Sequence, residues 1–110
     1  MVAAVNQVRA NVGLPALTVH STLTQVARNW SATLPSAFQH NPNVGSQIPA
    51  GWMAWGENIA YNVSMSAAQA ALEASPGHYA NMTNTSFTHI GIGIVELNGY
   101  VYVTQVFAKY

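Results

Sequence analysis

The chain has 110 residues, half of them apolar, which is the size of one small domain with a single core. Three Lys or Arg residues balance three Glu residues, so the basic surface of a nucleic-acid-binding protein is missing. Cysteine is absent, which excludes disulfides, thiol catalysis and cysteine-based zinc sites, and no apolar run approaches the roughly 18 residues of a membrane span. We therefore expect one domain over residues 1–110, with no nucleic-acid partner and no transmembrane segment.

The first third predicts two helices that face the core. Val5 and Val8 recur at helical spacing and Gly13 follows as a stop signal, so the first helix is expected to end near Asn11. Ser21 is the expected N-cap of the second helix. An apolar stripe on that helix predicts its buried face. The stripe consists of Leu23, Val26, Ala27, Trp30 and Leu34.

A long irregular segment follows the second helix. Residues 35–55 are rich in Pro, Asn, Gly and Ser and show no sustained period, which is typical of a loop that carries function. The sequence Ser66-Ala67-Ala68-Gln69 fits a capping box before an Ala-rich helix that ends before Pro76. His78 then lies in a second, short helix.

The C-terminal third predicts a β-hairpin. Residues 90–97 and 100–107 are rich in β-branched and aromatic side chains, and only Asn98-Gly99, the signal of a type I′ turn, separates them. Neither face is polar, so we expect helices on both sides of the sheet, with Gly91 and Gly93 admitting close packing. The predicted pairs are Leu97 with Tyr100 beside the turn, then Ile94 with Val103 and Ile90 with Phe107 on one face, and Val95 with Tyr102, Gly93 with Thr104 and Gly91 with Val106 on the other.

Few side chains can carry acid–base chemistry. Glu57, Glu73 and Glu96 are the only carboxylates, and Glu96 is expected to be solvated beside the hairpin turn. Glu57 lies among apolar and aromatic residues, where a buried carboxylate needs a partner. It has two compatible roles. In the structural role, Glu57 accepts backbone hydrogen bonds that hold the long loop. In the functional role, Glu57 orients a metal-bound imidazole or serves as a general base.

The four histidines differ in their expected roles. His40 lies in the long loop and His78 follows a helix stop, and each alone is weak evidence for a ligand because imidazole has many structural uses. His89 begins a strand and is expected to make a structural hydrogen bond, whereas His20 is expected at the surface. No Gly-x-Ser-x-Gly motif is present, so a serine hydrolase has no local support.

Several short motifs occur in a specific order along almost the entire chain. In this order they resemble the CAP superfamily, which comprises the cysteine-rich secretory, antigen 5 and pathogenesis-related proteins, in its short bacterial form without cysteine. The motifs are the opening helix Val5-Asn6-Gln7-Val8-Arg9, then Gly13-Leu14-Pro15-Ala16-Leu17, Phe38-Gln39-His40-Asn41, Gly56-Glu57-Asn58-Ile59-Ala60, Ser75-Pro76-Gly77-His78-Tyr79-Ala80-Asn81-Met82, Phe87-Thr88-His89-Ile90-Gly91-Ile92-Gly93 and Thr104-Gln105-Val106-Phe107.

The resemblance implies an α+β fold, a three-layer α/β/α sandwich around a mainly antiparallel sheet, with a cleft lined by two His and two Glu. His40 and His78 match the histidines that hold a divalent ion, often Zn²⁺, and Glu57 matches the first glutamate. Two imidazoles imply weak, exchangeable binding. Glu73 is the only candidate for the second glutamate. The position of Glu73 on the helix before His78 departs from the family pattern, so we do not expect Glu73 to complete the set of two His and two Glu.

Asn58 and Gln105 belong to matching motifs and are assigned to the surroundings of the cleft. The resemblance implies a secreted or cell-envelope protein, whose export signal or N-terminal region is expected to lie upstream of this chain. We expect a non-enzymatic binding module for a divalent ion and a peptide, glycan or lipid ligand. The alternatives are a metal-assisted hydrolase, peptidase-like, with Glu57 as general base, and a purely structural envelope domain.

Overall fold

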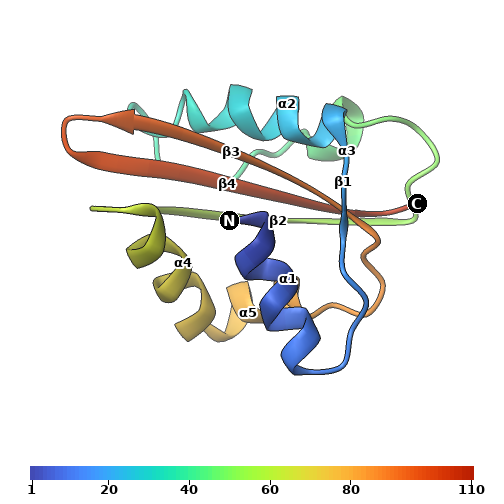
Figure 1. The fold of residues 1–110 in the computed structure, drawn as a ribbon. Helices are drawn as coiled ribbons and strands as arrows, with labels where there is room; N and C mark the ends of the chain where they lie inside the picture. The colour runs from blue at the N-terminus through green and yellow to red at the C-terminus, as the bar shows by residue number, and fades with distance from the viewer.

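The computed structural model describes residues 1–110, which form a four-stranded sheet between two layers of helices. In chain order the elements are α1 (Val2–Asn11), β1 (Thr18–Val19), α2 (Ser21–Ser31), α3 (Val44–Gln47), β2 (Ala54–Asn62), α4 (Met65–Ala74), α5 (Pro76–Met82), β3 (His89–Leu97) and β4 (Tyr100–Lys109). The strand order is β1-β3-β4-β2, and only the β1–β3 pair is parallel. Helices α2 and α3 cover one face, and α1, α4 and α5 cover the other (Figure 1). The predicted α+β sandwich with a mainly antiparallel sheet is confirmed.

The predicted hairpin register is also confirmed. Leu97 pairs with Tyr100 beside the turn, and the five other predicted residue pairs are all present. Asn98 and Gly99 have φ values of 53° and 83°, the left-handed backbone that a type I′ turn requires at both central residues. The turn therefore sets the register, and alternation along the two strands then determines which residues of β3 and β4 share a face.

The two strand glycines bring α2 directly onto the sheet. A Cβ atom added at Gly91 would collide with the backbone of α2 at Leu23 and Thr24, and one added at Gly93 would collide with the backbone at Ala27 and Arg28. Small residues at both positions therefore allow the helix backbone to contact the strand, as the sequence predicted.

The interpretation of residues 35–55 as one irregular loop is wrong at two places. Val44–Gln47 forms the short helix α3, and Ala54 begins β2, which pairs with β4 along its whole length to Asn62. Gly56, Glu57 and Asn58 have low strand propensity, so the residues of β2 carry no local strand signal. Packing against β4 overrides that local preference.

Both predicted helix caps are wrong by one or two residues. His20, and not Ser21, is the N-cap of α2, and its Nδ1 accepts a hydrogen bond from Thr22 N at 3.1 Å. Ser64, and not Ser66, is the N-cap of α4, where its Oγ accepts from Ala67 N at 3.1 Å. Gln69 is therefore free of a capping role and is buried against the sheet.

The apolar stripe of α2 is buried except at Trp30. Leu23, Val26 and Ala27 pack against β4 in the core between α2 and the sheet. Trp30 is only half-buried, and its Nε1 donates to Gln39 O at 2.9 Å, so the indole holds the start of the long loop. Leu34 is buried but lies beyond the end of the helix.

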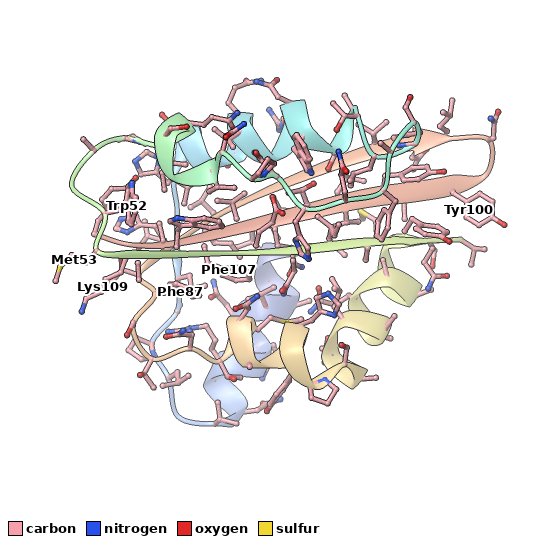
Figure 2. The ribbon with its side chains drawn as sticks, turned by 180° about the vertical axis from the view of Figure 1, so that it is seen from behind. Trp52, Met53, Phe87, Tyr100, Phe107 and Lys109 are labelled. Atoms are coloured by element: carbon pink, nitrogen blue, oxygen red, sulfur yellow. The ribbon has the colours of Figure 1, made fainter.

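The core on the other face joins α1, α4 and α5 to the sheet. Phe87 and Phe107 stack with ring centroids 5.5 Å apart on this side of the sheet (Figure 2). Arg9 of α1 is 1% exposed, and its guanidinium donates to the carbonyl oxygens of Pro15, Met82 and Asn84 at 2.8–3.0 Å. This side chain ties α1 to the end of α5. No helix of the structure is long and apolar enough to cross a membrane.

Candidate functional site

The candidate site lies at β2, which forms one edge of the sheet. Glu57 and Asn58 pair with consecutive residues of β4, so their side chains leave opposite faces of the sheet. Glu57 points into the α2 layer, where it contacts His40 of the long loop, and Asn58 points into the α5 layer, where it contacts His78. Figure 2 shows the long loop and α5 on either side of β2. The Gly-Glu-Asn motif therefore links the two layers.

Glu57 is a buried carboxylate with one oxygen bonded and one free. Its side chain is 2% exposed, and Oε1 accepts a hydrogen bond from Asn41 N at 2.9 Å and lies 2.9 Å from His40 Nδ1. Oε2 is buried and has no hydrogen-bond partner. Burial raises the pKa of Glu57, although the Asn41 hydrogen bond and His40 both act to lower it.

The two predicted metal ligands each have one ring nitrogen engaged. His40 is 62% exposed, and its Nδ1 faces Glu57, which leaves Nε2 without a partner in the chain. Nδ1 of His78 lies 2.8 Å from Ser75 Oγ, which again leaves Nε2 unpaired. Burial lowers the pKa of His78, and positive charge on His40 lowers this pKa further.

A chain of buried amides fixes α5 against β2. Asn58 Nδ2 donates to His78 O and to Gln105 Oε1, both at 3.1 Å. Asn81 Nδ2 donates to Asn58 Oδ1 at 2.8 Å, and Gln105 Nε2 donates to Gln69 Oε1 at 3.1 Å. Asn58 and Gln105 are fully buried, so both act behind the site by holding the segment that carries His78.

Glu73 lies on α4 at the far end of this chain of amides. Its Oε2 accepts from Gln69 Nε2 at 3.0 Å, and it makes no hydrogen bond or ion pair with His40, Glu57 or His78. The side chain is exposed. The structure therefore connects Glu73 to the site only through the amides.

The remaining predicted residues lie elsewhere. His89 Nδ1 is 2.7 Å from Thr88 Oγ1, and its ring packs against His20 and Tyr110 with centroids 5.8 and 5.5 Å apart. Glu96 is exposed beside the hairpin turn. Neither residue contacts the site at β2.

The chemistry available at this site is that of two imidazoles, one of them backed by a carboxylate. The structure has no group of three or more His, Cys, Asp or Glu side chains that could hold a metal ion. A cation placed between His40 and His78 would therefore take its other ligands from water. A carboxylate on the far nitrogen of a ligating imidazole orients the ring and makes it a stronger donor.

Comparison with known families gives an independent identification. Residues 2–107 match the model of CAP, the cysteine-rich secretory protein family. The chain belongs to this family. The match confirms the resemblance predicted from the ordered motifs, and no curated protein matches the chain.

Solved structures share the fold of this CAP chain. An outer surface protein from Borrelia burgdorferi has a TM-score of 0.84 and 17% identity, over 98% of this chain and 88% of that chain. An extracellular protein from Bacillus anthracis that contains a SCP domain has a TM-score of 0.80 and 26% identity, and the CAP chain spans only 38% of its length. The structure of NaASP2 with Zn²⁺ has a TM-score of 0.74 and 15% identity, over 96% of this chain and 75% of that chain.

Sequence reasoning did not single out several residues that shape the site of this CAP chain. Ser75 was expected only as part of a motif, and its position three residues before His78 was the available signal. Asn81 has the same offset on the other side of His78. Asn41 holds Glu57 through its backbone N–H, which agrees with the expectation that Glu57 accepts a backbone hydrogen bond from the long loop, although Asn41 was not named as the donor.

Proposed function

We propose that this CAP domain is a secreted or cell-envelope binding module in which His40 and His78 hold a divalent cation, with Zn²⁺ as the leading candidate. The observation that carries this proposal is the 2.9 Å contact between Glu57 Oε1 and His40 Nδ1. This contact leaves His40 Nε2 as the donor, and the Ser75 contact does the same for His78.

The residues present fit a weakly held cation. His78 has a lowered pKa, which favours the neutral imidazole that binds metal ions. Two protein donors leave several coordination positions for water or a ligand group, so binding is exchangeable. NaASP2, a protein of the same fold, was solved with Zn²⁺.

The extracellular location and the ligand class complete the proposal. The Bacillus anthracis protein is extracellular and the Borrelia burgdorferi protein is an outer surface protein. Only six side chains are formally charged, whereas eleven are aromatic: three Trp, five Tyr and three Phe. An uncharged or amphipathic peptide, glycan or lipid is therefore the ligand class that fits such a domain.

A metal-assisted hydrolase is the second candidate, and one observation favours it. Glu57 Oε2 has no partner and the pKa of this carboxyl is raised, as a general acid or base requires. However, Oε2 is buried, and a general base must reach the proton that it removes. The geometry therefore supports the binding module over the hydrolase.

Zinc titration of metal-free protein tests the proposal. We expect binding at about pH 7.5 that weakens at about pH 5.5, because protons compete for the imidazole nitrogens. His40→Ala and His78→Ala should each lower the affinity about 10-fold or more.

His89→Ala is the matched control, because it removes a histidine that does not contact the site. Equal zinc affinities for the three variants and the parent would contradict a shared cation site at His40 and His78 and would favour a purely structural domain. Peptide or ester turnover that is lost in His78→Ala would instead establish the hydrolase.

A further inference from the structure

A concave surface lies on the α2 side of the sheet, between α2 and the segment 41–47. It is a groove of about 410 Å³. Its polar lining comes from Thr22, Gln25 and Asn29 of α2 and from Asn41 and Gln47 across the groove, and Trp30 supplies an aromatic surface. His40, Glu57 and His78 do not line it.

The lining is ordered by hydrogen bonds that leave groups free. Asn41 is 2% exposed, and its Nδ2 donates to Gln47 Oε1 at 2.7 Å while its Oδ1 accepts from Asn43 N at 2.9 Å. Gln25 Nε2 donates to Asn29 Oδ1 at 2.9 Å. The indole of Trp30 is fixed by its bond to Gln39 O.

Several polar groups in the groove have no partner in the chain. Asn29 Nδ2 and Gln47 Nε2 are free donors, Gln25 Oε1 is a free acceptor, and the Thr22 hydroxyl can serve as either. Free donors thus lie on both sides of the groove, and the free acceptors lie on α2. A ligand rich in hydroxyl groups satisfies both kinds.

The absence of charge restricts the ligand class. No Lys, Arg, His, Asp or Glu lines the groove, so nothing in it would compensate a phosphate, a carboxylate or a metal ion. The face of an indole carries partial negative charge and packs against polarised C–H groups. Amides, one hydroxyl and one indole together match a neutral sugar, and the volume accommodates about one or two sugar rings.

We propose that this groove binds a neutral saccharide, with Trp30 packing against the sugar ring and Gln25, Asn29 and Gln47 hydrogen-bonding its hydroxyl groups. This site is separate from the proposed cation site and does not depend on it. Asn41 contributes to both, because its side chain lines the groove and its backbone N–H binds Glu57.

The test uses N,N′-diacetylchitobiose and cellobiose as neutral probes, and glucuronic acid and glucosamine as charged comparisons. Binding is followed by two-dimensional NMR of ¹⁵N-labelled protein. We expect the neutral probes to shift the Trp30 indole N–H and the Gln25 and Asn29 side-chain amide signals, with dissociation constants of the order of millimolar. The charged sugars should bind more weakly.

The chain supplies a matched control for the substitutions. Gln7 Nε2 donates to Asn11 Oδ1 at 2.9 Å on α1, which repeats the Gln25–Asn29 pair outside the groove. Gln25→Ala and Asn29→Ala should each weaken saccharide binding about three- to ten-fold. Gln7→Ala and Asn11→Ala should leave it unchanged. These exposed positions keep the test decisive even where Trp30→Ala does not fold.

Three outcomes would overturn the proposal. The first is no shift of the Trp30 signal by either neutral probe at about tenfold the expected dissociation constant. The second is equal weakening by the α1 and α2 variants. The third is tighter binding of the blocked dipeptide acetyl-Gln-Gln-amide than of either sugar, which would assign the groove to a peptide. Unchanged saccharide binding in His40→Ala would show that the groove acts independently of the cation site.

Discussion

Glu57 and Asn58 are neighbours on β2, yet each holds a different histidine-bearing segment. Glu57 contacts His40 on one side of the sheet, and Asn58 binds the backbone carbonyl of His78 on the other. The two residues therefore position the two halves of the candidate site. Substitution of either one should misplace only the half that it contacts.

Substitution of Glu57 by Gln should change the pH dependence of stability. Burial raises the pKa of Glu57, so its contribution to stability is fully present below its ordinary pKa of about 4.3 and is lost as pH rises through the raised value. The unfolding free energy of the parent, relative to Glu57→Gln, should therefore increase as pH falls from about 7 toward 4. Urea denaturation at several pH values measures this difference.

The exposed Glu96 supplies the control, since Glu96→Gln removes the same charge outside the core. A pH-independent difference between the parent and Glu57→Gln would contradict the raised pKa of this buried carboxyl. Zinc affinity should fall about 10-fold in Glu57→Gln, because an amide orients His40 but makes it a weaker donor.

Substitution of Gly93 by Ala should be severely destabilising. The added methyl group would collide with the backbone of α2, which cannot move without separating α2 from the sheet. We expect a loss of about 3 kcal/mol or more in unfolding free energy. Gly77→Ala is the matched control, because a Cβ there meets nothing within 4 Å, and α5 should tolerate or gain from it. Similar melting temperatures for the two variants would show that α2 can move away from β3 at little cost.

Arg9 should tolerate neither Ala nor Lys. Its three guanidinium nitrogens together donate to four carbonyl oxygens, those of Pro15, Met82, Asn84 and Phe87, and the side chain is almost completely buried. Arg9→Ala leaves the carbonyl oxygens of Pro15 and Met82 without this donor inside the fold and should cost about 3–5 kcal/mol. Arg9→Lys restores the positive charge but lacks the planar guanidinium with its several donors, so it should recover only part of this stability. Complete recovery by Lys would show that charge, and not the fork geometry, is what α1 requires.

Trp30 should contribute less to stability than a core residue on the same helix. Trp30→Ala removes a half-buried ring and one hydrogen bond to the loop, for a cost of about 1–3 kcal/mol. Leu23→Ala empties a fully buried position and should cost about 2–5 kcal/mol. Thermal unfolding of the two variants checks the order. A larger loss for Trp30→Ala would mean that the loop beyond α2 carries more of the stability than its burial indicates.

The elements that sequence analysis predicted are those whose signals are local. The hairpin follows from one turn dipeptide and from alternation along two strands, so the pairs from Leu97–Tyr100 to Ile90–Phe107 could be counted outward from the turn. Each short motif is likewise formed by neighbouring residues, and the resemblance of their order to the CAP superfamily identified His40, Glu57 and His78 as candidates.

The parts that sequence analysis missed depend on distant partners. Glu57 and Asn58 occupy a strand only because β4 pairs with β2, and Gln69 is buried only because Gln105 faces it from the sheet. A histidine is also an uncommon N-cap, so Ser21 was the better local choice although His20 takes that position. Such features arise from tertiary packing, which a single sequence does not display.

The amides behind the site all donate in one direction. Asn81 donates to Asn58, Asn58 to Gln105, Gln105 to Gln69, and Gln69 to the carboxylate of Glu73. Rotation of any one amide by 180° would place donor against donor on one side and acceptor against acceptor on the other. The chain of amides can therefore reverse its direction only as a whole, and the negative charge of Glu73 at its end sets that direction. Replacement of Glu73, on the exposed surface of α4, by a positively charged residue would favour the reversed direction of these hydrogen bonds. The reversal would reach the backbone carbonyl of His78 through Asn58, without any contact between the side chains of residues 73 and 78.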